Sequence, residues 1–163
     1  MTTLLVSSHA LGMDEPRAKK PILCAVDLTP TTKSAKIDAA RDLALRALDY
    51  ARAFGSDLEL VAAYVAPPPD HPLALTGEDE ESRRQREAMA AVLAGLPDDV
   101  RGIVRAGIPR EVILRRAEEI DAGLIVAGQP AGGVLRRVVM GSVMERLLNA
   151  TDRPLVVLPR RRE

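Results

Sequence analysis

The residues best suited to chemistry form a glycine-rich segment in the last quarter of this 163-residue chain. It begins at Gly128, continues through Gly132 and Gly133, and reaches Gly141 and Ser142. Glycine lets a backbone approach an anion closely, and the unpaired amides at the start of a helix favour phosphate. The hydroxyl of Ser142 adds a donor. The segment therefore predicts a phosphate-binding loop, with a glycine turn that only reverses the chain as the alternative.

Asp27 is the acidic residue expected to face this loop, because it follows the apolar run 22–26. In an open parallel sheet, ligands bind beyond the carboxyl ends of strands, where the winding reverses. If 22–26 and 123–127 are the first and fourth strands, Asp27 and Gly128 lie across one crevice. A carboxylate there could accept hydrogen bonds from ribose hydroxyls or hold phosphate oxygens through a cation.

The elements that position these residues alternate along the chain. Short apolar runs separate longer stretches of helical periodicity, which is typical of a parallel sheet covered by helices. We therefore expect an α/β fold with five parallel strands, the third of which is the most polar and belongs at an edge. The expected strands are 22–26, 58–65, 100–105, 123–127 and 154–158.

Four helices are expected between and after these strands. The first carries an apolar stripe over 40–54 and ends at Gly55, a predicted C-cap. The second has its stripe over 89–96, and the third over 113–120. Ser142 is expected to cap the fourth.

The segment 66–79 holds four prolines and is expected to be an exposed loop. His71 lies in it without cysteine or carboxylate partners at ligand spacing, so we expect no metal site. The charged run 78–87 is expected to form the solvated face of the second helix.

Composition limits the class of protein. The chain has 47% hydrophobic residues and enough length for one domain, expected over 20–163, behind a flexible extension over 1–19. Its 23 basic and 23 acidic residues favour neither nucleic acid nor a membrane surface as partner. Cys24, the single cysteine, is expected to be a buried thiol. Without a secretory signal or membrane span, the expected location is the cytoplasm, and Met13 is an alternative start.

The order of motifs from residue 20 to residue 160 resembles the universal stress protein family. The motifs are ILCAVD, LELVAAYV, AGIPREVILRRAEE, GLIVAG, MGSVMERLL and RPLVVLP. The resemblance implies a doubly wound, Rossmann-like sheet of the adenine nucleotide alpha hydrolase type, with strand order 3-2-1-4-5 and helices on both faces. It also implies binding of ATP, ADP or AMP, with or without Mg²⁺, and a role as a stress-response switch.

The nucleotide-binding branch of that family has a glycine, two residues, a second glycine, nine residues, and then glycine with serine or threonine. Ala131 stands at the second glycine position here, and Gly132 follows it. If that position requires a positive φ, alanine costs roughly 1 kcal/mol, unless the loop shifts by one residue to use Gly132. By resemblance, Asp27 contacts the sugar or phosphates and the Val65 backbone meets the adenine edge. The expected binding set is Ala25, Val26, Asp27, Val65, Ala127, Gly128, Ala131, Gly132, Gly141, Ser142, Val143 and Met144.

The connection after Asp27, LTPTTKSAKID, is about ten residues longer than is usual in the family. Its polar side chains are expected either to donate to phosphates and cover the site, or to begin a longer helix. These side chains are Thr29, Thr31, Thr32, Lys33 and Ser34.

The resemblance further implies a homodimer formed through the last strand, over 154–159. The chain has no phosphate loop ending in lysine with serine or threonine, and no plausible serine, histidine and acid trio. We therefore expect no catalytic residues and at most slow ATP hydrolysis. The alternative function is a nucleotide-free dimeric module that binds an unidentified protein partner.

Overall fold

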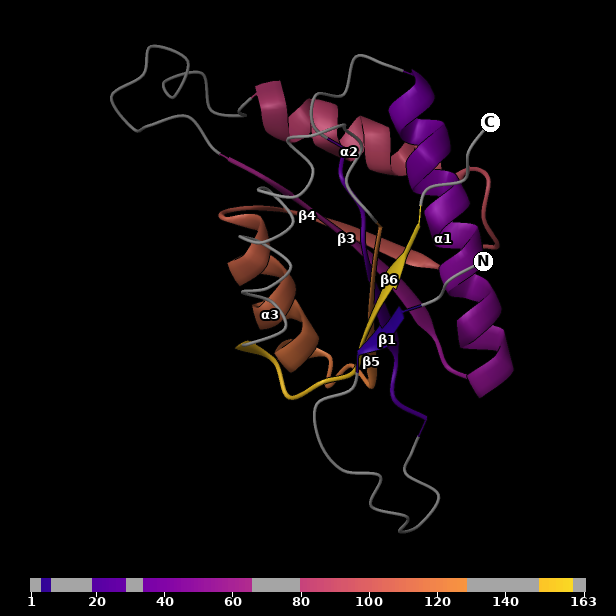
Figure 1. The fold of residues 1–163 in the computed structure, drawn as a ribbon. Helices are drawn as coiled ribbons and strands as arrows, with labels where there is room; N and C mark the ends of the chain where they lie inside the picture. The colour runs from indigo at the N-terminus through magenta and orange to yellow at the C-terminus, as the bar shows by residue number, and fades with distance from the viewer. Residues whose placement is uncertain (1–3, 7–18, 29–33, 66–79, 129–149, 160–163) are drawn as a thin grey trace, which may run out of the picture.

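The computed structural model describes residues 4–6, 19–28, 34–65, 80–128 and 150–159. The described residues form one sheet with the strand order β1-β6-β5-β2-β3-β4 (Figure 1). Strands β2 to β6 run parallel to one another, and their order confirms the predicted order 3-2-1-4-5. The polar strand β4 lies at an edge, as predicted. The strands are β1 Leu4–Val6, β2 Ile22–Ala25, β3 Leu58–Tyr64, β4 Arg101–Ala106, β5 Leu124–Gly128 and β6 Leu155–Leu158.

The strand β1 adds a sixth, antiparallel strand to the five predicted parallel strands. It pairs antiparallel with β6, with Leu4 opposite Val157 and Val6 opposite Leu155. It lies within the stretch 1–19 that the sequence analysis assigned to a flexible extension. Three residues are too few to show a strand period, so the sequence gives no sign of a pairing that depends on a partner about 150 residues away. The outer edge of β6 is therefore covered by the chain itself.

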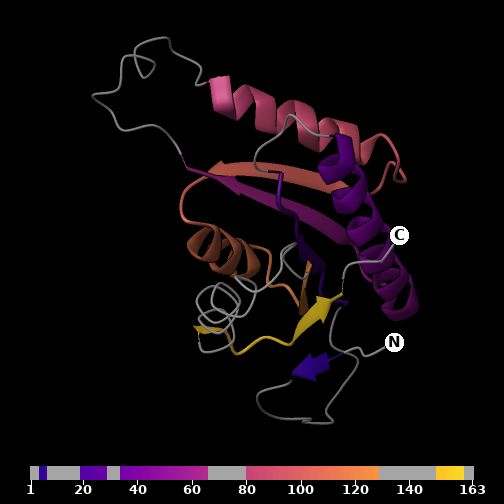
Figure 2. The same cartoon turned by 45° about the horizontal axis from the view of Figure 1, so that its top comes forward.

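Helices lie on both faces of the sheet, which confirms the doubly wound architecture (Figure 2). Helices α1, Ser34–Phe54, and α2, Glu80–Leu93, cover one face. Helix α3, Pro109–Glu119, covers the other. The fourth expected helix, from Ser142, lies outside the described residues.

The central strands β2 and β5 are buried on both faces, which explains their continuous apolar sequence. Cys24 and Val126 point into the core under α1 and α2, whereas Leu23 and Ile125 point into the core under α3. Burial raises the pKa of the Cys24 thiol to about 12, and the predicted buried thiol is confirmed.

Two helices end with a residue in the left-handed conformation. At the end of α1, Gly55 has φ 61°, and the Ser56 N–H donates to the Ala51 carbonyl at 2.8 Å. This is the predicted C-cap. At the end of α3, Asp121 has φ 50°, and the Ala122 N–H donates to the Ala117 carbonyl at 2.8 Å.

Two helix faces differ from the prediction. Phe54 was expected in the buried stripe of α1 but is 62% exposed, because it is the last residue of the helix. Gln85 lies in the run predicted to face solvent, yet it is fully buried. A glutamine among charged residues carries no sequence signal of burial, because only its tertiary partners decide it.

A network of ion pairs ties α3 to β3 and β4. The buried Glu59 accepts two hydrogen bonds from Arg116, at 2.6 and 2.8 Å. Arg116 also donates to Glu119 at 2.8 Å, and Glu119 accepts two bonds from Arg105, both at 2.9 Å. The bond to Glu59 is the main cause that raises the pKa of Arg116. Arg116, followed by Arg105, lowers the pKa of Glu119.

We expect Glu59→Gln to lower the free energy of unfolding by about 2–3 kcal/mol, because it removes the buried carboxylate from the partly buried Arg116 and leaves it paired with the more exposed Glu119. The double variant Glu59→Leu, Arg116→Met should recover most of this loss, since it removes both charges. Arg105→Ala, which breaks the more exposed pair, is the control and should cost less than about 1 kcal/mol. Urea unfolding monitored by circular dichroism measures all three. A loss in the double variant as large as in Glu59→Gln would contradict the desolvation argument.

Candidate functional site

The carboxyl edge of the sheet holds the expected site, where the order of strands reverses between β2 and β5. From β2 the chain proceeds through β3 to β4 on one side, and later through β5 to β6 on the other. Ala25 of β2 pairs with Ala127 of β5. Asp27 lies two residues beyond Ala25, and Gly128 ends β5, so the structure brings both to the same edge as expected.

Two buried neighbours fix the direction of Asp27. The Val26 N–H donates to the Val61 carbonyl at 3.0 Å, and the Val26 and Leu28 side chains are both buried. Because side chains alternate along an extended segment, the residue between them points outward. The Asp27 side chain is 72% exposed.

Lys36, in the first turns of α1, forms an ion pair with Asp27 that the sequence analysis missed. Its Nζ donates to the Asp27 Oδ2 at 3.1 Å. The residue belongs to the lengthened connection after Asp27, in which the polar side chains of residues 29–34 were predicted to face the site. The alternative of a longer helix leads to this residue. Because α1 begins at Ser34, Lys36 lies on the helix rather than in the loop.

Gln85 of α2 holds the backbone that follows Asp27. Its Nε2 donates to the Leu28 carbonyl at 3.4 Å and to the Glu81 carboxylate at 2.8 Å. Both partners are acceptors, so the amide nitrogen must face them. The buried Oε1 has no hydrogen-bond partner among the described residues. Gln85 thus links α2 to the edge of the site, a role that sequence alone did not indicate.

Gly128 leaves room for α1 on the sheet. A Cβ placed on Gly128 would come within 3.0 Å of the Leu43 Cδ2 of α1. Ala127, before it, is buried, whereas Gly128 is partly exposed. Packing is therefore one reason for glycine here, and close approach of a ligand is a second, compatible one.

Two exposed apolar side chains stand beyond the neighbouring strands β3 and β4. Val65 follows β3 and is 75% exposed, and Ile108 lies just before α3 and is also exposed. The two strand ends are joined, because the Gly107 N–H donates to the Tyr64 carbonyl at 2.8 Å. Gly107 has φ 143°, a conformation that L side chains rarely adopt, which explains the glycine in the Gly107, Ile108, Pro109 motif.

The structure therefore gathers Ala25, Val26, Asp27, Ala127 and Gly128 at one edge, with Val65 at the end of the adjacent strand. The other expected binding residues lie outside the described residues and stay predictions. They are Ala131, Gly132, Gly141, Ser142, Val143 and Met144.

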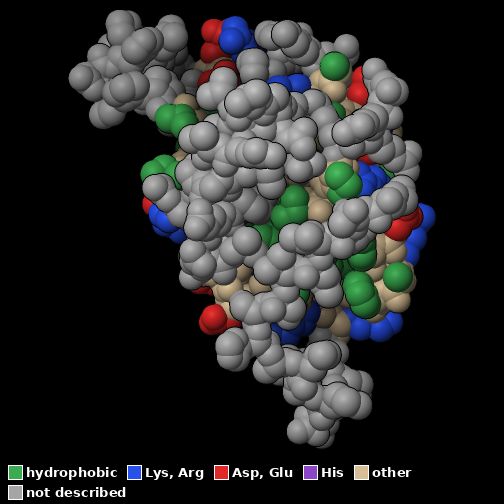
Figure 3. Space-filling model, in the orientation of Figure 1, with side chains coloured by type: hydrophobic (Ala, Val, Ile, Leu, Met, Phe, Trp, Pro, Cys, Tyr) green, Lys and Arg blue, Asp and Glu red, His purple; other side chains and the backbone are tan. Residues whose placement is uncertain are grey.

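Neither a candidate metal cluster nor a helix able to cross a membrane is found in the part of the chain that the structure describes. No group of three or more histidine, cysteine, aspartate or glutamate side chains within them could hold a metal ion. None of the helices in the described part combines the length and hydropathy that crossing a bilayer requires. On the face seen in Figure 3, both basic and acidic side chains are visible around the margin of the described surface.

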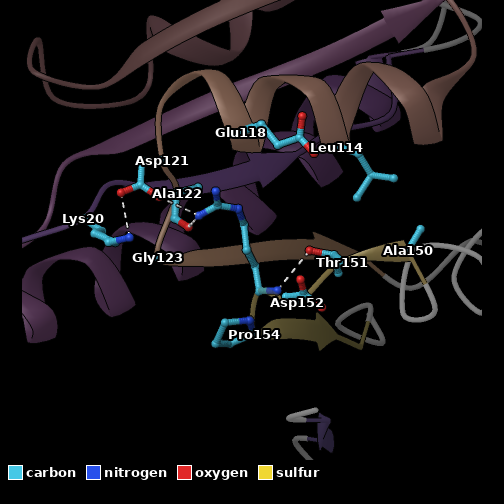
Figure 4. A pocket seen from close by; sticks show the side chains of 11 residues that line it. Lys20, Leu114, Glu118, Asp121, Ala122, Gly123, Ala150, Thr151, Asp152 and Pro154 are labelled. Atoms are coloured by element: carbon cyan, nitrogen blue, oxygen red, sulfur yellow. Dashed lines mark hydrogen bonds and ion pairs between the residues drawn. The ribbon is translucent and has the colours of Figure 1, made fainter. Parts of the chain in front are cut away.

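A pocket of about 390 Å³ lies at the opposite, amino-terminal edge of the sheet (Figure 4). Three of its charged side chains pair with one another: Asp121 lies 2.6 Å from Lys20 and 3.0 Å from Arg153. These two hydrogen bonds, that from Lys20 first, lower the pKa of Asp121. The lining is Lys20, Leu114, Glu118, Asp121, Ala122, Gly123, Ala150, Thr151, Asp152, Arg153 and Pro154.

The sequence profile of the universal stress protein family matches residues 19–159. The chain belongs to this family. A universal stress protein of Synechocystis sp. is 30% identical to it over 122 residues, which are 74% of this chain and 78% of that protein. Another, from Methanocaldococcus jannaschii, is 28% identical over 82 residues; the match spans 50% of this chain and about half, 51%, of that protein.

Solved structures of universal stress proteins have the same fold. One, from Archaeoglobus fulgidus in complex with dAMP, has a TM-score of 0.57 and 22% identity, and covers 85% of this chain and 96% of its own. A second, in complex with cAMP, has a TM-score of 0.55 and 20% identity, and covers 86% of this chain and 98% of its own. Identities this low establish the fold of this universal stress protein and leave its ligand to be argued from its own residues.

We expect Gly107→Ala to lower the free energy of unfolding by about 1–2 kcal/mol, because alanine is strained at this positive φ. Gly128→Ala is the matched control. Gly128 ends β5, three places from β4 in the sheet, it has no positive φ, and the atoms nearest to its new methyl group belong to the Leu43 side chain. The substitution should cost less than about 1 kcal/mol. Thermal unfolding of both variants tests the difference, and equal losses would show that crowding rather than φ decides.

Proposed function

We propose that this universal stress protein binds an adenine nucleotide (AMP, ADP or ATP) at the carboxyl edge between β2 and β5 and acts as a regulatory switch. The observation that carries the proposal is the register of Ala25 with Ala127, which sets Asp27 and Gly128 side by side where the winding reverses. The complexes of related folds with dAMP and cAMP support an adenine nucleotide as the class of ligand.

Each described group suits one part of such a ligand. The exposed Asp27 carboxylate accepts hydrogen bonds from ribose hydroxyls. The apolar Val65 and Ile108 side chains offer surface to the flat base, and the Val65 backbone is the proposed partner of the adenine edge. Gly128 allows the backbone to approach the phosphates, which the glycine-rich segment after it would bind.

We infer that the protein binds its nucleotide and does not turn it over efficiently. Hydrolysis of ATP requires a group that orients the attacking water and a metal that neutralises phosphate charge. Among the described residues, Asp27 is the acidic candidate at this edge of the sheet, and it is engaged with Lys36. We therefore expect any turnover to stay below about 1 per second, under the ordinary range of enzymes.

We also propose a homodimer formed through the outer edge of β6, in which β1 competes with the second copy. The observation that favours competition is the pairing of β1 with the residues Leu155 to Val157 of that edge. A short strand contributes few hydrogen bonds, so a second copy of β6 can replace it.

The nucleotide site is tested by calorimetric titration of AMP, ADP and ATP, with and without Mg²⁺, into nucleotide-stripped protein. We expect micromolar binding that Gly128→Asp weakens at least 100-fold, because a carboxylate beside phosphates costs several kcal/mol. Asp121→Asn, in the pocket at the opposite edge, is the control and should bind as the unmodified chain does. Near-ultraviolet and far-ultraviolet circular dichroism checks that each variant is folded. No heat and no thermal shift at millimolar nucleotide would favour the nucleotide-free interaction module instead.

The assembly is tested by sedimentation of the full chain and of a chain that begins at Met13 and so lacks β1. We expect removal of β1 to lower the dimer dissociation constant at least tenfold, because the competing strand is gone. Leu5→Pro, which disrupts pairing without shortening the chain, should act in the same direction. Monomers of all three proteins at micromolar concentration would contradict the dimer.

A further inference from the structure

We propose that Lys36 is a phosphate ligand of this site, which leaves Asp27 when a nucleotide binds and so favours nucleotides over the uncharged nucleoside. The inference rests on the proposed nucleotide site and adds to it the residue that senses the phosphate charge. None of the sequence motifs described above includes a role for Lys36.

The geometry begins with the placement of α1. The helix returns antiparallel to β2, so its amino end and the carboxyl end of β2 lie at the same side of the sheet (Figure 1). Leu43 of α1 packs against the position of Gly128. Lys36 precedes Leu43 by seven residues, which is about two turns and roughly 10 Å along the same face of the helix. Lys36 therefore lies beyond the carboxyl end of β5, on the side where phosphates bound near Gly128 would lie.

The ion pair places the ammonium group of Lys36 beside Asp27, at the same edge of the sheet as Gly128. Its Nζ lies 3.1 Å from the Asp27 Oδ2, and the lysine side chain is 29% exposed. The nearest acidic residue on its own helix, Asp38, is engaged by Arg41 at 3.3 Å. Asp27 therefore contributes the described carboxylate that Lys36 contacts, and the four-carbon stem lets the ammonium move without a change in the helix.

The charges explain why the site needs this lysine. A phosphate brought beside the Asp27 carboxylate alone would meet a like charge, and the cation removes that repulsion. Because the Asp27 carboxylate is largely exposed, the pair is held weakly and can be exchanged. A ribose hydroxyl that takes Asp27 as its acceptor releases the ammonium and its three donors for the phosphate.

The movement of Lys36 from Asp27 to the phosphate makes the site prefer nucleotides to nucleosides. A nucleoside must separate Lys36 from Asp27 and offers the lysine nothing in return. A nucleotide supplies a stronger anion to the same lysine. Removal of the lysine should therefore weaken the binding of AMP and ATP while adenosine is bound as well as before or slightly better.

The experiment is calorimetric titration of adenosine, AMP and ATP into the full chain, in EDTA, at low and moderate salt. Lys36→Gln should weaken AMP and ATP at least tenfold and leave adenosine within about threefold. Lys36→Arg should retain most of the nucleotide affinity, because it keeps the charge. Lys20→Gln is the matched control, since Lys20 forms a comparable pair with Asp121 at the far edge of the sheet and should leave all three affinities unchanged. Thermal unfolding checks that the variants are folded.

The outcomes separate this inference from the proposed function. If the unmodified chain binds neither adenosine nor nucleotides, the proposed function is wrong. If it binds nucleotides and Lys36→Gln binds them equally well, the function stands and Lys36 is no phosphate ligand. If Lys36→Gln loses adenosine and AMP to the same degree, the lysine only positions Asp27, and the inference is likewise overturned.

Discussion

The parallel pairing of β2 with β5 is the constraint on which the rest of this molecule depends. Four consecutive residue pairs, from Ile22 with Leu124 to Ala25 with Ala127, lie in the middle of the sheet. Their side chains alternate between two cores, so a shift by one residue would exchange the sets that face α1 and α3. The register is therefore fixed by packing on both faces. Its consequence is that Asp27 and Gly128 lie at the same edge of the sheet, where the order of strands reverses.

Helices supply the polar groups that this apolar centre cannot. α1 contributes Lys36 to the carboxylate of Asp27, and α2 contributes the buried amide of Gln85 to the carbonyl of Leu28. Both contacts fall on the three residues directly after β2. The segment that leaves the central strand is thus held from two helices that pack on the same face of the sheet.

The sequence predicted the sheet well because buried parallel strands are continuous apolar runs, and β2 and β5 are of this kind. It missed β1 because a three-residue strand has no period of its own. It missed Lys36 because the ion pair depends on where α1 begins and in which phase, and it misplaced Gln85 because charge patterning does not record tertiary hydrogen bonds. The expected loop with Ala131 and Gly132 lies outside the described residues, so the phosphate half of the site remains a sequence prediction.

The buried Cys24 gives this protein a property that is useful at the bench. Its thiol lies in the middle of the sheet, and its raised pKa keeps it protonated at neutral pH, so it lacks the thiolate that alkylating reagents attack. A single cysteine engineered at a site position such as Val65 could therefore be labelled with a fluorophore without replacing the natural one. Conversely, Cys24 itself can be alkylated only in molecules whose sheet has opened. The rate of its alkylation in the unmodified chain therefore reports global unfolding.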